Sequence, residues 1–150
     1  MAAATLLAGA QFIAHSTWKW AELQSRTGRP VYRYYYVHPR PAAKDPVANP
    51  PHPGAVHSSE IEYALGNLAT NQVYVWTPQD DSVSSAIQAY FANFVKTGNP
   101  NGAGLPTWPA AGPGNVTVMV LDVHSHAEPE QHREVFVFLD SLHLGANPER

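Results

Sequence analysis

The N-terminal part of the chain repeats its apolar positions with the period of a helix and then changes to an unbroken run. The apolar positions that form one helical stripe are Leu6, Leu7, Ala10, Ile13, Ala14, Trp18, Ala21 and Leu23. Residues 27–30 contain a glycine and a proline, which predict the C-terminal end of this helix. Residues 31–37 carry four tyrosines between two valines and predict a strand that is covered on both faces.

A proline-rich segment separates this strand from the next helical pattern. Residues 39–53 contain six prolines, which excludes a helix or a regular ladder and predicts an extended loop. The loop leads to residues 54–57, with the sequence Gly-Ala-Val-His. Residues 58–68 then show a short apolar pattern that ends at Gly66, which predicts one or two helical turns.

The clearest helical pattern lies in the middle of the chain. Apolar residues recur at three- and four-residue spacing from Val83 to Val95, and Gly98 predicts the C-terminal end. Asp80, Asp81 and Ser82 are the N-cap candidates. After a turn-rich loop at residues 99–106, residues 116–123 predict a second strand and residues 129–144 a last amphipathic helix.

The order of these elements predicts an α/β protein in which few strands pack with about three helices. Only two strands are convincing in 150 residues. Since sheets usually contain four to six strands and an isolated pair is weak, we expect the sheet to be incomplete.

Composition narrows the function classes. A length of 150 residues predicts a single domain, and a formal charge of −3 argues against a nucleic-acid partner. The chain contains no cysteine, which excludes disulfides, cysteine-ligated metals and thiol nucleophiles. We recognise neither a membrane span nor a signal peptide, and the cellular location stays open.

His57 is the first candidate for chemistry, because it follows a long loop after a strand, where α/β folds place catalytic side chains. Four motifs surround it in order. They are GRPVYRY at residues 28–34, GAVHSSEI at residues 54–61, YFANFVKTGNPNG at residues 90–102 and LPTWP at residues 105–109. Together they resemble the C-terminal third of type B carboxylesterases, the para-nitrobenzyl esterase and cholinesterase family.

The resemblance implies the C-terminal part of an α/β-hydrolase fold and a serine esterase mechanism without a cofactor. In this resemblance His57 matches the family's catalytic histidine, which is the base that takes a proton from a serine nucleophile. It implies no metal, and it leaves Glu60 with a structural role.

The chain departs from the family in its nucleophile. It contains no G-x-S-x-G elbow, and the serines and acids before His57 are Ser16, Glu22, Ser25 and Asp45. Ser58 and Ser59 are poor candidates for the nucleophile, because no donors of an oxyanion hole can be identified for them. We therefore expect residues 1–150 to be a single C-terminal segment of a carboxylesterase domain, inactive alone and acting on a small-molecule ester when the remainder is present. Its unpaired strand edge predicts self-association.

Two alternatives stay open. His124, His126, Glu128 and His132 have the residue types of a metal site, and would make the protein a small metal-dependent hydrolase. The other alternative is a fragment without catalytic activity, which binds a partner through its exposed apolar surface.

Overall fold

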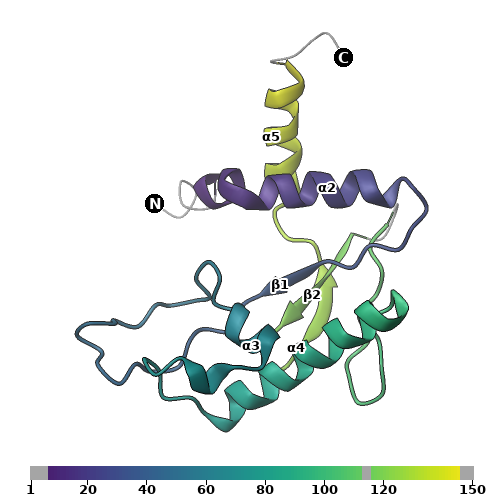
Figure 1. The fold of residues 1–150 in the computed structure, drawn as a ribbon. Coiled ribbons are helices and arrows are strands. Elements are labelled where there is room, and N and C mark those ends of the chain that lie inside the picture. The colour runs from purple at the N-terminus through teal and green to yellow at the C-terminus, as the bar shows by residue number, and fades with distance from the viewer. Residues whose placement is uncertain (1–6, 113–115, 146–150) are drawn as a thin grey trace. The chain divides into compact units, whose positions relative to one another are not determined.

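The computed structural model describes residues 7–112 and 116–145. The chain divides into two compact units. The first unit is built from residues of 1–33, 110–117 and 129–150, and the second unit from residues 34–109 and 118–128. Figure 1 shows the elements of both units along the chain, and each unit is described by itself.

The first unit consists mainly of two helical segments. A π-helical turn η1 (Ala10–Ala14) continues into α2 (His15–Ser25), and α5 (Arg133–Gly145) packs against both. The buried ring of Trp18 stacks on Phe136 at a centroid distance of 5.8 Å. The N-terminal helix is thus confirmed for the described residues, whereas Leu6 lies outside them.

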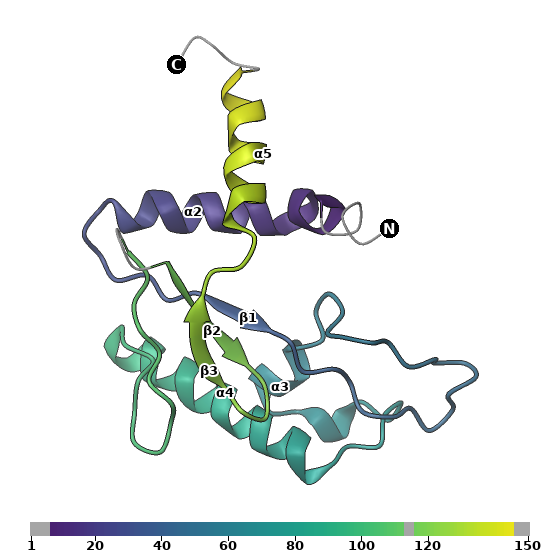
Figure 2. The ribbon, with the colours of Figure 1, turned by 180° about the vertical axis from the view of Figure 1, so that it is seen from behind.

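Three strands form one sheet in the order β1-β2-β3. They are β1 (Tyr34–Tyr36), β2 (Thr117–Leu121) and β3 (His126–Pro129). β1 and β2 are parallel, and Tyr34 pairs with Met119. Residues 122–125 connect β2 to β3 (Figure 2), and a connection this short permits only an antiparallel pair.

The sheet corrects two expectations. β3 was not predicted, since its sequence His-Ala-Glu-Pro lacks the β-branched residues that mark strands, and α5 consequently begins at Arg133 instead of residue 129. The predicted coverage of both faces of the first strand is wrong. Tyr36 is buried, but Tyr35 is 64% exposed, because successive side chains point to opposite faces and one face of β1 stays open.

In the second unit, two helices pack on each other and on one face of the sheet. They are α3 (Ile61–Leu65), which a 3₁₀ turn η2 (Leu68–Thr70) follows, and α4 (Pro78–Thr97). The Ser84 hydroxyl donates a 2.7 Å hydrogen bond to the carbonyl oxygen of Tyr63. The largest fully buried side chains here are Tyr63, Tyr90, Ile87, Met119 and Leu121. These residues form the core that fixes the end of the sheet against α4.

The N-terminus of α4 differs from the prediction. Its N-cap is Thr77, followed by Pro78, and none of Asp80, Asp81 and Ser82 takes that role. The Asp80 carboxylate accepts a 2.8 Å hydrogen bond from the Thr77 amide, while the Asp80 amide donates to the Thr77 hydroxyl at 3.4 Å. The pattern is a capping box in which Asp80 supplies the acid of the first turn.

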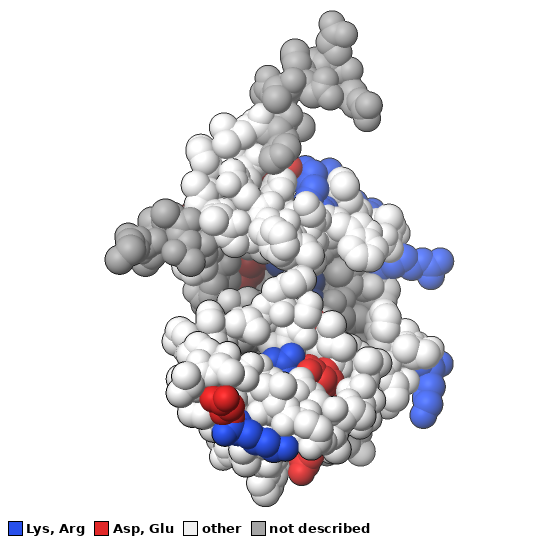
Figure 3. Space-filling view, turned by 60° about the vertical axis from the view of Figure 1, so that its left-hand side comes forward, with Lys and Arg blue, Asp and Glu red and all other residues white. Residues whose placement is uncertain are grey.

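The surface carries few charges and many apolar side chains. On the face shown in Figure 3, residues other than Lys, Arg, Asp and Glu predominate. Exposed large apolar residues occur in both units, among them Phe12, Trp20, Tyr35 and Val95. Among the helices within residues 7–112 and 116–145, none is long and apolar enough to cross a membrane.

Candidate active site

His57 lies on an exposed turn between the proline-rich loop and α3. The Ser59 amide donates a 3.1 Å hydrogen bond to the carbonyl oxygen of Val56, which makes His57 and Ser58 the two central residues of a β-turn. Ser58 has a left-handed backbone with φ of 65°, a conformation that costs energy for a serine. The turn thus presents the His57 side chain at the surface while Ser59 is buried.

The loop that carries His57, residues 39–60, folds back on the segment before α4. The Lys44 amide donates to the Val73 carbonyl at 2.8 Å, and the Val75 amide donates to the Ala42 carbonyl at 2.9 Å. A surface hollow of about 300 Å³ lies inside this arrangement, with proline, alanine and Tyr74 in its walls. Val56, the neighbour of His57 in sequence, lines the same hollow.

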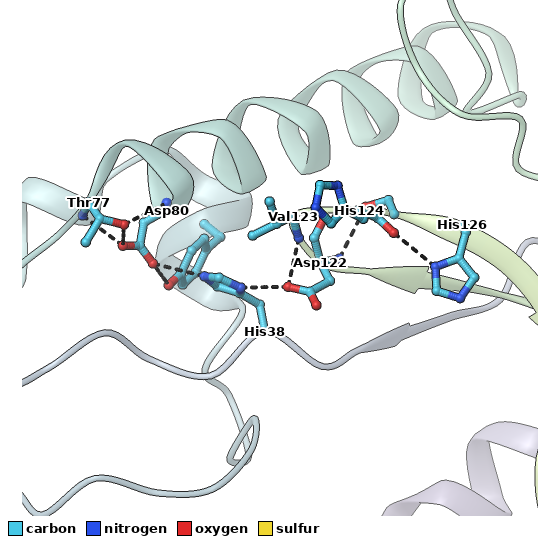
Figure 4. A network of polar contacts seen from close by, with 9 residues as sticks. His38, Thr77, Asp80, Asp122, Val123, His124 and His126 are labelled. Carbon is cyan, nitrogen blue, oxygen red and sulfur yellow. Dashed lines mark hydrogen bonds and ion pairs between the residues drawn. The ribbon is translucent and has the colours of Figure 1, made fainter.

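A buried polar network lies where the loop begins (Figure 4). The Nδ1 atom of His38 lies 2.7 Å from Oδ1 of Asp122, and its Nε2 atom lies 3.1 Å from Oδ1 of Asp80. The Tyr63 hydroxyl donates a 2.6 Å hydrogen bond to the same Asp80 oxygen, and Thr77 donates to the other one. We call His38, Tyr63, Thr77, Asp80 and Asp122 the His38 network.

The His38 network holds charge inside the second unit. Burial of the Asp80 carboxyl raises its pKa, but hydrogen bonds from Thr77, Tyr63 and His38 outweigh burial, so the pKa lies below its usual value. Burial also raises the pKa of the Tyr63 hydroxyl, which stays a donor to Asp80. Both ring nitrogens of His38 face carboxylate oxygens, Nδ1 toward Asp122 and Nε2 toward Asp80. The network thereby ties the end of β1 to the end of β2 and the start of α4.

The sequence interpretation did not identify the His38 network. Its members lie up to 84 positions apart, and no spacing along the chain relates them. The available signal was a polar residue at the end of each predicted strand, His38 and Asp122, followed by an acid at the start of the clearest helix.

Of the other serines and acids considered for the reaction, Glu22, Ser25 and Asp45 have hydrogen-bond or ion-pair partners. Ser25 donates a 2.8 Å hydrogen bond to the carbonyl oxygen of Glu22, and the Glu22 carboxylate pairs with Arg133. Asp45 accepts hydrogen bonds from the amides of Val47 and Ala48 in its own loop. These contacts assign Glu22, Ser25 and Asp45 to structure.

The metal candidates form no metal-binding group among the residues that the structure describes. The Nδ1 atom of His126 lies 3.0 Å from the backbone oxygen of His124, and its Nε2 atom lies 3.6 Å from Oε2 of Glu128. His132 belongs to the other unit and lies 3.9 Å from Glu134. In the part of the chain that the structure describes, no group of three His, Cys, Asp or Glu residues could hold a metal ion. The metal-dependent alternative therefore gains no support.

Solved esterase structures share this fold. A carboxylesterase of Geobacillus stearothermophilus superposes with a TM-score of 0.62 at 26% identity, covering 78% of this chain and 23% of that chain. A PNB esterase superposes with a TM-score of 0.58 at 26% identity, covering 71% of this chain and 21% of the other. The fold is therefore the C-terminal part of an α/β-hydrolase, and its three strands are a small, open portion of the sheet.

The family follows from sequence. The model of the carboxylesterase family matches residues 2–137, and the chain belongs to that family. Pyrethroid hydrolase Ces2e of Rattus norvegicus is 40% identical over 85 residues, which cover 57% of this chain and 15% of the relative. Carboxylesterase 5A of Canis lupus familiaris is 34% identical over 122 residues, covering 78% of this chain and 21% of the relative. The chain thus spans about a fifth or less of the curated relatives' length.

Proposed function

We propose that this chain supplies the catalytic histidine, His57, to a serine carboxylesterase whose nucleophile and acid lie outside these 150 residues. The observation that carries the proposal is the position of His57 on an exposed turn, within the segment that the carboxylesterase family model matches. A base that serves a serine on another segment must be accessible, and the exposed turn at His57 meets this requirement, whereas the buried His38 does not.

The proposed reaction has two halves. The His57 imidazole takes the proton of a serine hydroxyl while the serine oxygen attacks the ester carbonyl carbon. The protonated imidazole then gives that proton to the leaving alcohol as the carbon–oxygen bond breaks, which leaves an acyl-enzyme. Water repeats both steps and releases the carboxylic acid and the free serine. No electrons are exchanged, so the mechanism requires no redox cofactor.

The substrate class is a carboxylic ester. One relative is named a pyrethroid hydrolase and another an acylcarnitine hydrolase, which supports small-molecule esters as substrates. The same proposal makes residues 1–150 a single segment of one hydrolase domain. It also makes the isolated chain inactive, because a base without its nucleophile has no proton to take.

A chimera tests the proposal. In it, this chain replaces the matched segment of the PNB esterase, which keeps its own serine elbow. We expect a fluorophosphonate to label the elbow serine of the chimera, and the substitution His57→Gln to slow labelling by about 10²-fold or more. Labelling at an unchanged rate in a folded His57→Gln chimera would overturn the proposal. The isolated chain should show no label and no turnover of a p-nitrophenyl ester.

A further inference from the structure

Arg40 and Glu62 form a two-pronged ion pair across the base of the loop that carries His57. The Nη1 atom of Arg40 donates to Oε1 of Glu62 at 3.0 Å, and Nη2 donates to Oε2 at 2.7 Å. Arg40 lies near the beginning of the loop, and Glu62 lies in the first turn of α3, directly after it. The pair therefore closes residues 41–61 into a ring that contains His57.

Further contacts hold both partners in place. The Asn71 side chain donates a 2.6 Å hydrogen bond to Oε1 of Glu62, and the Arg40 guanidinium lies over the ring of Tyr74, 4.9 Å from its centroid. Burial of the Glu62 carboxyl raises its pKa, but the bonds from Arg40 and Asn71 outweigh burial and bring the pKa below its usual value. Both side chains are less than one fifth exposed, so water screens the pair weakly.

The segment between the partners has little regular structure of its own. Ala43 forms an isolated bridge with Tyr74, and the 54–60 stretch contains neither helix nor strand. The turn at His57 also contains the left-handed Ser58, a conformation that persists only when its surroundings enforce it. Fixing the two ends of a loop restricts the conformations open to its middle.

We infer that Arg40 and Glu62 are positioning residues for His57: their ion pair holds the ends of the loop together and keeps the turn at residues 56–59 in one conformation. The inference rests on the proposed function for its catalytic meaning, because a general base must be held in register with its serine. Arg40 and Glu62 act through the loop and not on the reacting atoms.

The order of the His57 amide tests the inference without any assay of activity. In the ¹⁵N-labelled full chain we expect a generalised order parameter of about 0.85 at His57, falling below about 0.6 in Glu62→Gln and in Arg40→Gln. The reversed pair Arg40→Glu with Glu62→Arg should recover part of the order. Arg40→Lys keeps the charge without the two-pronged geometry and should give an intermediate value.

The chain offers a matched control in its other unit. Arg133 donates to both carboxylate oxygens of Glu22 at 3.1 Å, which is the same geometry between α2 and α5. Glu22→Gln should therefore leave the order parameter at His57 unchanged. If a single variant at position 40 or 62 does not fold, Asn71→Ala removes one donor to Glu62 and should lower the order at His57 by a smaller amount.

Unchanged order at His57 in the folded variants would overturn the inference. In the chimera, Glu62→Gln should lower kcat per labelled serine several-fold with little change in KM, and the reversed pair should restore part of it. Loss of order at His57 with full activity in the chimera would overturn the catalytic meaning of the inference, whereas the proposed function is overturned only by an undiminished His57→Gln chimera.

Discussion

The Nδ1 atom of His38 lies 2.7 Å from Oδ1 of Asp122, although 84 positions separate the two residues. The contact links the end of β1 to the end of β2, at the point where the chain enters the loop that carries His57. On its other side, His38 faces Asp80 at the start of α4. Because His38 joins two buried or half-buried carboxylates, the loss of one partner leaves uncompensated charge inside the second unit.

The hydroxyl of Tyr63 provides one test of the His38 network. Tyr63→Phe removes a 2.6 Å hydrogen bond to the ionised Asp80 and should lower the free energy of unfolding by about 1.5–3 kcal/mol. Urea unfolding followed by circular dichroism measures the difference. Tyr35→Phe is the control, since Tyr35 is mostly exposed, and it should change stability by less than about 0.5 kcal/mol. Equal effects of the two substitutions would contradict the assigned role of Tyr63.

The lowered pKa of Asp80 predicts how stability depends on pH. An unfolded aspartate titrates near a pKa of about 3.9, so the stabilisation from Asp80 is complete above that pH and is lost as pH falls through the lower folded value. Asp80→Asn should reduce stability at pH 6 and flatten the loss between pH 6 and pH 3. Urea unfolding at both pH values provides the comparison. A variant with an unaltered pH slope would show that Asp80 does not contribute in this way.

The capping box places the N-cap of α4 at Thr77, whereas the sequence predicted an N-cap at residues 80–82. Thr77→Ala removes the side chain that accepts from the Asp80 amide and should cost about 1 kcal/mol of stability. Ser82→Ala changes a predicted cap that lies on an exposed turn inside the helix and should have an effect within about 0.5 kcal/mol. Thermal unfolding of the two variants distinguishes these positions, and a larger loss from Ser82→Ala would refute the assignment.

The open edge of β1 predicts self-association of the isolated chain. Within the residues that the structure describes, β1 pairs only with β2, and Tyr35 leaves one face of the strand exposed. Tyr35→Lys should shift the mass measured by light scattering toward the monomer. Val47→Lys places the same charge on a loop residue that is 92% exposed, and it should change the mass little. A wild-type chain that stays monomeric at high concentration would contradict this prediction.

The sequence predicted those parts of the fold that depend on local pattern. The helix that became α4 shows apolar residues at regular spacing and ends at Gly98, whose φ of 75° suits glycine. Gly66 ends α3 for the same reason, with φ of 65° and Gln88 so close that a Cβ atom would lie 2.4 Å from its Oε1 atom. The glycine that ends each helix is a local signal, whereas the contact of Gly66 with Gln88 is not.

The sequence could not predict features that depend on distant segments. β3 is a strand because it lies beside β2, since its own residues favour no strand. Tyr35 was expected to be covered because a tyrosine-rich run is typical of a core, yet its face of β1 is open. The family motif identified His57 as the catalytic candidate. The contacts of Arg40 with Glu62 could not be predicted, because they depend on how residues 39–60 fold.

The most direct measurement is kcat/KM for hydrolysis of a p-nitrophenyl ester by the chimera with this chain, with and without His57→Gln. We predict a loss of about 10²- to 10⁴-fold, as removal of a general base requires. His52→Gln changes another exposed histidine in the same loop and should leave kcat/KM within about twofold. A folded His57→Gln chimera with undiminished kcat/KM would contradict the account.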